Sequence, residues 1–149
     1  MIPVISFWVD GLPIAQPRQK QTKFGGNYLP KDHPVQYWKV LVAESYKRAY
    51  EQEKNPINLN KPIALTLLFM FPRPKNMQWK TRLWLRLWHT KKPDLDNLIK
   101  AVKDSLNGIA WCDDAQVFSL LVQKYICSAT DKIGCSVVIE YMESESENA

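Results

Sequence analysis

The chain has 149 residues, and its 46% hydrophobic content predicts one globular domain with a sizeable core rather than a disordered chain. Twenty lysines and arginines oppose 15 acids, and three of those acids lie in the last seven residues, so the body of the chain is strongly basic. Such a charge favours an anionic partner, most often nucleic acid. With no apolar run as long as a membrane span and no apparent signal peptide, we expect an intracellular, cytoplasmic protein without a membrane partner.

The first half of the chain predicts two strands and one helix. Residues 2–9 mix apolar and β-branched side chains, which is typical of a strand. A long proline-rich loop follows over residues 10–34. Apolar side chains at a spacing of three to four then predict a helix over residues 35–54. The apolar run of residues 62–71 predicts a second strand, which Pro72 ends.

Basic residues concentrate in the loop of residues 10–34 and in the segment of residues 73–92. The segment holds seven basic residues and three tryptophans but no acid, and its pattern fits a strand and a helix equally well. Basic side chains contact phosphates, so we predict DNA contacts in both places, whereas we expect the tryptophans in the core or at a dimer interface. The DNA-binding candidates here are Arg18, Lys20, Lys23, Arg73, Lys91 and Lys92.

Two adjacent glycines, Gly25 and Gly26, interrupt the first basic loop. They lack the spacing of a phosphate-binding loop and are predicted to form a turn. We therefore expect no nucleotide cofactor.

The second half of the chain predicts a helix followed by two strands. The helix begins after Asp94 or Asp96, either of which can cap it, and ends at residues 107–108, which are Asn and Gly. Residues 116–127 and 135–142 predict two strands that we expect to pair as a hairpin.

The predicted elements follow the order β-α-β-α-β-β. This order indicates an α/β protein with one mixed sheet and helices packed on it. We expect a single domain over residues 1–142. The acidic residues 143–149 are expected to form a disordered tail.

Acidic residues gather around the second helix, in the run P-D-L-D-N-L-I-K-A-V-K-D-S-L-N-G and the later D-D-A-Q-V. On a helical wheel with about 100° per residue, Asp96, Lys100 and Lys103 share one edge beside the apolar face. Asp94 lies just before the first turn, and the pair at residues 113–114 follows a further turn. Two carboxylates so close together repel each other, and one suffices for capping, so the set indicates a cation site.

A hard cation such as Mg²⁺ suits this set of acids. It binds one or two carboxylates together with phosphate oxygens, and it lowers the pKa of an attacking water. Asp94, Asp96 and one or both of Asp113 and Asp114 are the candidate ligands, while Lys100 would stabilise charge that develops on a phosphate. As the alternative, the aspartates form caps and a polar turn, and Lys100 forms a salt bridge within the helix.

The run of residues 92–117 resembles the signature of the RusA family of Holliday-junction resolvases, and its flanks match more loosely. That family consists of small homodimeric endonucleases that need Mg²⁺ or Mn²⁺ and cut four-way DNA junctions by paired nicks. The resemblance implies a RusA-like fold, with Asp94, Asp96 and Asp114 as metal ligands and Lys100 as a catalytic residue. It does not separate the role of Asp113 from that of its neighbour.

The hypothesis from the sequence is a metal-dependent endodeoxyribonuclease that acts in DNA recombination and repair. Asn97 and Gln116 match motif positions and are expected to orient ligands or contact DNA, and Lys103 joins the DNA-binding candidates. A homodimer is also expected from symmetry, because two strands of a two-fold junction must be cut. The alternatives are a non-catalytic junction-binding module and a hydrolase of small phosphate substrates. The sequence does not show which surface forms the dimer. The candidates are the apolar strands at residues 67–71 and 118–122 and the tryptophan-rich segment.

Overall fold

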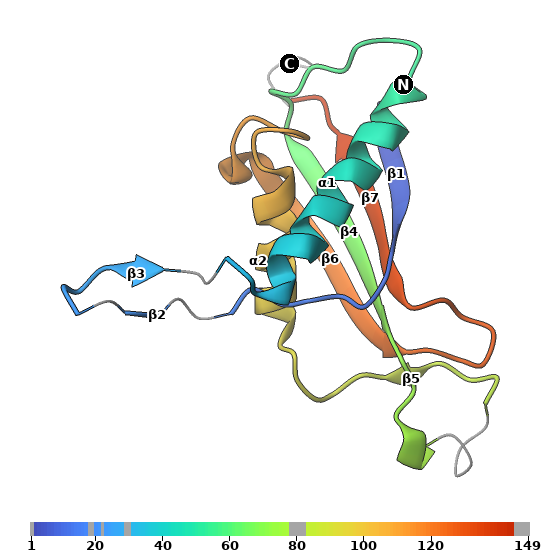
Figure 1. The fold of residues 1–149 in the computed structure, drawn as a ribbon. Coiled ribbons are helices and arrows are strands. Elements are labelled where there is room, and N and C mark those ends of the chain that lie inside the picture. The colour runs from blue at the N-terminus through green and yellow to red at the C-terminus, as the bar shows by residue number, and fades with distance from the viewer. Residues whose placement is uncertain (1, 18–19, 22, 29–30, 78–82, 145–149) are drawn as a thin grey trace.

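The protein forms two layers, a five-stranded sheet and two helices that cover one of its faces (Figure 1). The computed structural model describes residues 2–144 except 18–19, 22, 29–30 and 78–82. The sheet strands are β1 (Val4–Asp10), β4 (Ile63–Phe71), β5 (Leu87–Trp88), β6 (Val117–Ile126) and β7 (Gly134–Tyr141), and the helices are α1 (Pro34–Glu51) and α2 (Leu95–Leu106). Two 3₁₀ turns are η1 (Lys75–Met77) and η2 (Asp114–Gln116), and β2 (Lys20–Gln21) pairs with β3 (Asn27–Tyr28) in a hairpin that projects away from the sheet (Figure 1). The predicted α/β class with one mixed sheet is confirmed.

The strand order in the sheet is β1-β7-β4-β6-β5. Strands β4 and β6 are parallel, and the other neighbouring pairs are antiparallel. The predicted hairpin between the last two strands is therefore wrong, because β7 lies between β1 and β4 rather than beside β6. With β1 and β4 as its neighbours, β7 has backbone partners along both edges, and its helix-facing residues Cys135, Val137 and Ile139 are fully buried.

The core lies between the helices and one face of the sheet. Alternate residues of β4, among them Leu65, Leu67 and Phe69, point toward the helices and are almost completely buried. Trp38 of α1 and Leu98 of α2 fill the same core cluster. Each such side chain contributes about 1.5–3 kcal/mol by leaving water. This packing fixes α2 against the sheet and thereby places its polar edge.

Buried hydroxyl groups connect the first helix, the last strand and the loop after α2. The Tyr46 and Tyr141 hydroxyls lie 3.0 Å apart, and Tyr141 also donates to the carbonyl oxygen of Ala110 at 2.8 Å. Burial raises the pKa of both tyrosines, so they stay neutral at physiological pH. The bond to Ala110 holds the chain only three residues before the predicted acidic pair.

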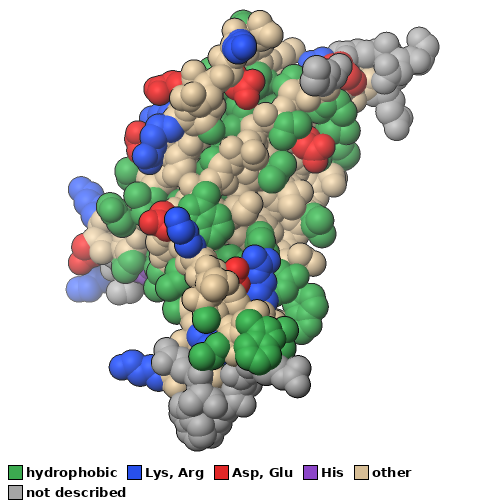
Figure 2. All heavy atoms as spheres, turned by 90° about the vertical axis from the view of Figure 1, so that its right-hand side faces the viewer, with side chains coloured by type: hydrophobic (Ala, Val, Ile, Leu, Met, Phe, Trp, Pro, Cys, Tyr) green, Lys and Arg blue, Asp and Glu red, His purple; other side chains and the backbone are tan. Residues whose placement is uncertain are grey.

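The opposite face of the sheet carries neither of the two helices. Small and polar residues such as Ser6, Thr66 and Ser136 share it with Trp8 and Leu121. Figure 2 shows the molecule from the β1 side of the sheet, where hydrophobic side chains lie scattered among polar and charged ones. Neither α1 nor α2, the helices of the described chain, is long and apolar enough to cross a membrane.

The basic segment of residues 73–92 forms only short elements where it is described. It contains η1 and the two-residue strand β5, so it is neither the long helix nor the long strand that its pattern allowed. Trp84 and Trp88 are 72% and 68% exposed, so neither lies in the core, and of the two predicted places the dimer interface stays a prediction. Trp88 stacks on Tyr125 at a ring-centre distance of 4.9 Å. Trp79 lies outside the described residues.

An ion pair holds the first residue of the predicted acidic tail. Glu143, its first residue, accepts from the ammonium group of Lys61 at 2.7 Å. The last five residues of the predicted tail, 145–149, lie outside the part that the structure describes.

Asp131→Asn should make the protein less stable at neutral pH but not in acid. Arg86 donates twice to the Asp131 carboxylate, at 3.0 Å each, and thereby lowers its pKa to about 2. The unfolded-state pKa is about 4, so this pair stabilises the fold fully above about pH 4 and loses its contribution as pH falls toward 2. We expect a cost of about 1 kcal/mol, or a loss of about 2–4 °C in Tm, at pH 7 and a vanishing difference near pH 2.

Thermal unfolding followed by circular dichroism at pH 7, 4 and 2 measures this effect. The exposed Asp32→Asn serves as the control and should match the wild type throughout. A Tm difference for Asp131→Asn that persists unchanged at pH 2 would contradict the linkage to this carboxylate.

Candidate active site

The polar edge of α2 and the turn η2 enclose a shallow pocket of about 300 Å³. Asp96 and Lys100 come from the helix, as the wheel predicted, and Asp114 joins them from η2 although it is 18 positions further along the chain. The lining residues are Asp96, Ile99, Lys100, Lys103, Asp104 and Asp114. The pocket therefore combines three carboxyl groups and two ammonium groups at the border between core and solvent.

The amphipathic sequence of α2 explains why these groups lie at that border. Leu98, Val102 and Leu106 are fully buried against the sheet, so the adjoining helix edge must face outward. The helix ends before Gly108, whose φ of 78° is a left-handed value that favours glycine. The amide of Gly108 donates to the carbonyl oxygen of Trp111 at 2.8 Å, which closes the turn that leads back to η2.

Trp111 holds one of the pocket carboxylates. Its indole is fully buried, and its Nε1 donates to Oδ1 of Asp114 at 2.8 Å. Because the ring cannot move without disturbing the core, it fixes the orientation of this carboxylate. The sequence offered one signal for this role, a tryptophan three residues before the second aspartate of the acidic pair.

The structure separates Asp113 from Asp114. Asp114 lines the pocket, whereas the Asp113 carboxylate accepts from the amide of Ala115 at 3.3 Å and caps η2. Gln116 completes this capping box by accepting from the Asp113 amide, and it donates to the carbonyl oxygens of Leu59 and Lys61. The predicted DNA contact of Gln116 would require breaking these bonds, whereas Asp113 could contribute to a metal site only through the carboxylate oxygen that its cap does not use.

Asp94 occupies the N-cap position of α2, next to the pocket but not in its lining. It is exposed, and its side chain makes no capping hydrogen bond. The carboxylate thus keeps its oxygens available at the positive end of the helix. Asn97, the third residue of the helix, is half-buried, and its backbone carbonyl oxygen accepts from the backbone amide of Gln16.

The carboxylates suit a hard divalent cation. Asp96 and Asp114 supply two carboxylates in one pocket, and Mg²⁺ binds one or two of them together with waters and phosphate oxygens. The residues that line the pocket include no cysteine or histidine, which zinc prefers. Within the described residues, no group of three or more His, Cys, Asp or Glu side chains could by itself hold a metal ion.

Asp104 differs from the other pocket acids because a lysine opposes it. The ammonium group of Lys39, on α1, lies 3.8 Å from its carboxylate. This pair joins the two helices and, among the residues that the structure describes, leaves Asp96 and Asp114 as the pocket carboxylates without such an ion pair, beside Lys100 and Lys103. The geometry therefore supports Asp104 as a structural neighbour of the site.

The remaining DNA-binding predictions fall on different parts of the molecule. Lys23 is exposed in the β2–β3 hairpin, and Lys91 and Lys92 are exposed just before α2. Arg18 lies outside the described residues, as does the side chain of Lys20.

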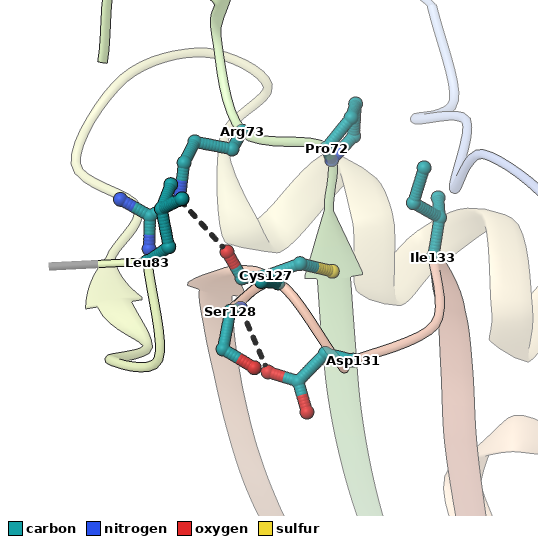
Figure 3. A pocket seen from close by; sticks show the side chains of 8 residues that line it. Pro72, Arg73, Leu83, Cys127, Ser128, Asp131 and Ile133 are labelled. Carbon is teal, nitrogen blue, oxygen red and sulfur yellow. Dashed lines mark hydrogen bonds between the residues drawn. The ribbon is translucent and has the colours of Figure 1, made fainter. Parts of the chain in front are cut away.

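Arg73 makes local contacts at the far end of the sheet. Its Nε donates to the carbonyl oxygen of Cys127 at 3.2 Å, and a second guanidinium nitrogen donates to the carbonyl oxygen of Leu85. Arg73 and Cys127 line a separate pocket of about 500 Å³. In the same pocket, the Ser128 amide donates to the carboxylate of Asp131 (Figure 3). Arg73 therefore connects the tryptophan-rich segment to the end of β6. A DNA phosphate would have to bind the same guanidinium group that already donates to these two carbonyl oxygens.

Comparisons with known proteins relate the chain to one family. The family model described as "Endodeoxyribonuclease RusA" matches residues 10–138. The chain is 31% identical over 127 residues to "Uncharacterized protein YqaN" of Bacillus subtilis (strain 168), covering 81% of this chain and 87% of that protein. It is 25% identical over 123 residues to "Crossover junction endodeoxyribonuclease rusA" of Lactococcus phage r1t, covering 79% and 84%.

Proposed function

Because the chain belongs to the RusA endodeoxyribonuclease family, we propose that it is a Mg²⁺-dependent endonuclease that resolves four-way DNA junctions in recombination and repair. The observation that carries this proposal is the pocket in which Asp96 and Asp114 lie with Lys100. Two carboxylates and an ammonium group on a basic protein match the needs of phosphodiester hydrolysis.

Each group of the pocket has a role in this proposal. Asp96 and Asp114 would hold the cation, with Asp94 at the helix start as a further ligand, and Mn²⁺ could replace Mg²⁺. When bound, the cation would neutralise the phosphate and lower the pKa of an attacking water. Lys100 would stabilise the negative charge that grows on the phosphate in the transition state. Lys103 would bind a flanking phosphate.

The proposed enzyme acts as a homodimer, in which two sites cut two strands of a two-fold junction. Strand β6 supports this proposal. In the described structure, β5 pairs with Tyr125 and Ile126, and the His89 amide bonds to Lys124, so the outer edge of residues 117–123 carries no strand partner. Phe118 and Leu121 on this stretch are 62% and 59% exposed. Antiparallel pairing of β6 with its copy would cover these side chains and satisfy the open backbone groups.

Leu121→Asp should convert the dimer into a monomer. A carboxylate at the centre of the paired edge would face its own copy across the two-fold axis, and the two charges would repel in a desolvated interface. Size-exclusion chromatography with light scattering should give the monomer mass of 17.3 kDa for the variant and twice that for the wild type. Tyr37→Asp, at an exposed position on α1, is the control and should stay dimeric. A dimeric Leu121→Asp would place the interface elsewhere.

Cleavage of defined DNA substrates tests the function. Labelled four-way, three-way, flapped and linear DNA are incubated with the protein and Mg²⁺, and the products are mapped on both strands. We expect symmetric nicks in the four-way junction and little cutting of linear DNA, with chelation stopping the reaction. Junction binding without cleavage would instead support a non-catalytic binding module. Hydrolysis of small phosphate esters with no DNA binding would support the small-substrate hydrolase.

A further inference from the structure

Lys124 lies beside the candidate site, although its position in the sequence marks no motif. It is on β6, in register with Phe69 of β4, and therefore on the face of the sheet that the helices cover. Its ammonium group donates to the carbonyl oxygens of Lys91 and Pro93. The second of these carbonyls belongs to the peptide bond that leads directly to Asp94.

The environment of Lys124 is half-buried and contains Asp94. Burial lowers the pKa of Lys124, and the negative charge of Asp94 partly offsets that effect, so the two groups lie within electrostatic reach. The chain segment before Asp94 is also bound to β6 through its backbone, because the amide of His89 donates to the carbonyl oxygen of Lys124 at 3.2 Å. The His89 ring packs on Phe71 at a centre distance of 4.6 Å.

These contacts attach the segment of residues 89–93, which leads into α2, to β6 at both of its ends. The His89 backbone bond holds its beginning, and the Lys124 ammonium holds its end, one residue before Asp94. An apolar side chain at this position would leave both carbonyl oxygens without this donor. The positive charge also reduces the repulsion between Asp94 and Asp96 when no cation is bound.

We propose that Lys124 is a positioning residue, which orients Asp94 for cation binding by fixing the segment from Lys91 to Pro93. This inference rests on the proposed metal-dependent function, of which Asp94 is a suggested ligand. Residues that orient a metal ligand without touching the metal change metal affinity by about 10–100-fold when they are replaced. Loss of the lysine charge alone would act in the opposite direction, because it would make the site more negative and the cation bind more tightly.

Calorimetric titration of the DNA-free protein with Mn²⁺ tests the inference. Lys124→Met keeps the length of the side chain but removes the donor, and we expect its Kd for Mn²⁺ to rise about 10–100-fold. Lys124→Arg keeps a donor and a charge, and it should stay within a few-fold of the wild type. Lys132→Met, at an exposed lysine near the same end of the sheet, is the matched control and should not change the Kd. Junction cleavage by each variant should follow its Mn²⁺ affinity.

The possible outcomes distinguish failure of the positioning role of Lys124 from failure of the proposed metal-dependent function. A Lys124→Met protein that binds Mn²⁺ as tightly as a functional wild type, or more tightly, overturns the positioning role and leaves the proposed function intact. A wild type that neither binds Mn²⁺ nor cuts junctions overturns the proposed function, and the inference with it. If Lys124→Met does not fold, Lys124→Gln retains one donor group and should give an intermediate affinity. Wild-type affinity in that variant would equally overturn the inference.

Discussion

Asp96→Asn removes junction cleavage, with an expected fall in rate of at least about 10³-fold. The amide keeps the shape of the side chain but lacks the negative charge that holds a cation, and cation catalysis contributes several kcal/mol. Asp96 is exposed on the polar edge of α2, so the change leaves the core untouched. Junction binding should persist or become tighter, because one charge that repels DNA phosphates is gone.

A pair of assays on the same preparation checks this result. Single-turnover cleavage of a labelled four-way junction gives the rate, and gel-shift titration in Ca²⁺ gives the binding affinity. Asp104→Asn is the matched control, since that residue lines the same pocket but is opposed by Lys39, and it should change the rate only a few-fold. Cleavage by Asp96→Asn within about tenfold of the wild type would falsify the assignment of the site.

Lys100→Met should slow the chemical step by about 10²–10³-fold, the usual cost of losing one group that stabilises transition-state charge. The ammonium is exposed at the pocket, and methionine preserves the helix and the aliphatic stem. Because the lysine acts on charge that develops only during the reaction, the affinity for the junction should change little. The loss should therefore be seen in kcat rather than in KM.

Lys103→Met provides the comparison for this variant. Lys103 lines the same pocket one turn along α2 and is proposed to bind a flanking phosphate. Its replacement should weaken junction binding and reduce the salt dependence of binding, with a smaller effect on the single-turnover rate. If Lys100→Met behaved in the same way as Lys103→Met, Lys100 would be a binding residue and not a catalytic one.

Local sequence patterns predicted α2 and its polar edge well. The predicted end at residues 107–108 agrees with the observed last residue Leu106, and Asp94, one of two cap candidates, is the N-cap. Both signals are local, since they depend on the helical period and on glycine's access to a left-handed conformation. The proximity of Asp114 to Asp96 followed from the motif but not from any local rule.

Contacts between distant segments were not predictable in this way. Trp111 and Lys124 support the site through a buried ring and through backbone carbonyl groups, and neither interaction leaves a periodic pattern. Arg73 was assigned to DNA because of its charge, and Gln116 because it matches a motif position, yet both bond to carbonyl groups of the protein itself. Composition cannot distinguish these two uses, because the same donors serve both. The place of β7 was missed for a similar reason, since adjacent strands in sequence usually pair.

The short strand β5 also has a consequence for handling the protein. In the described structure, the outer edge of β6 is open over residues 117–123 and exposes Phe118 and Leu121. An edge of this kind accepts any extended chain, and so a monomer released from the proposed dimer would be prone to aggregation. A variant that only weakens the proposed interface, such as Leu121→Ala, would therefore precipitate as it is diluted or heated. A charged residue at the same position prevents strand addition by foreign chains as well, which makes it the better route to a soluble monomer.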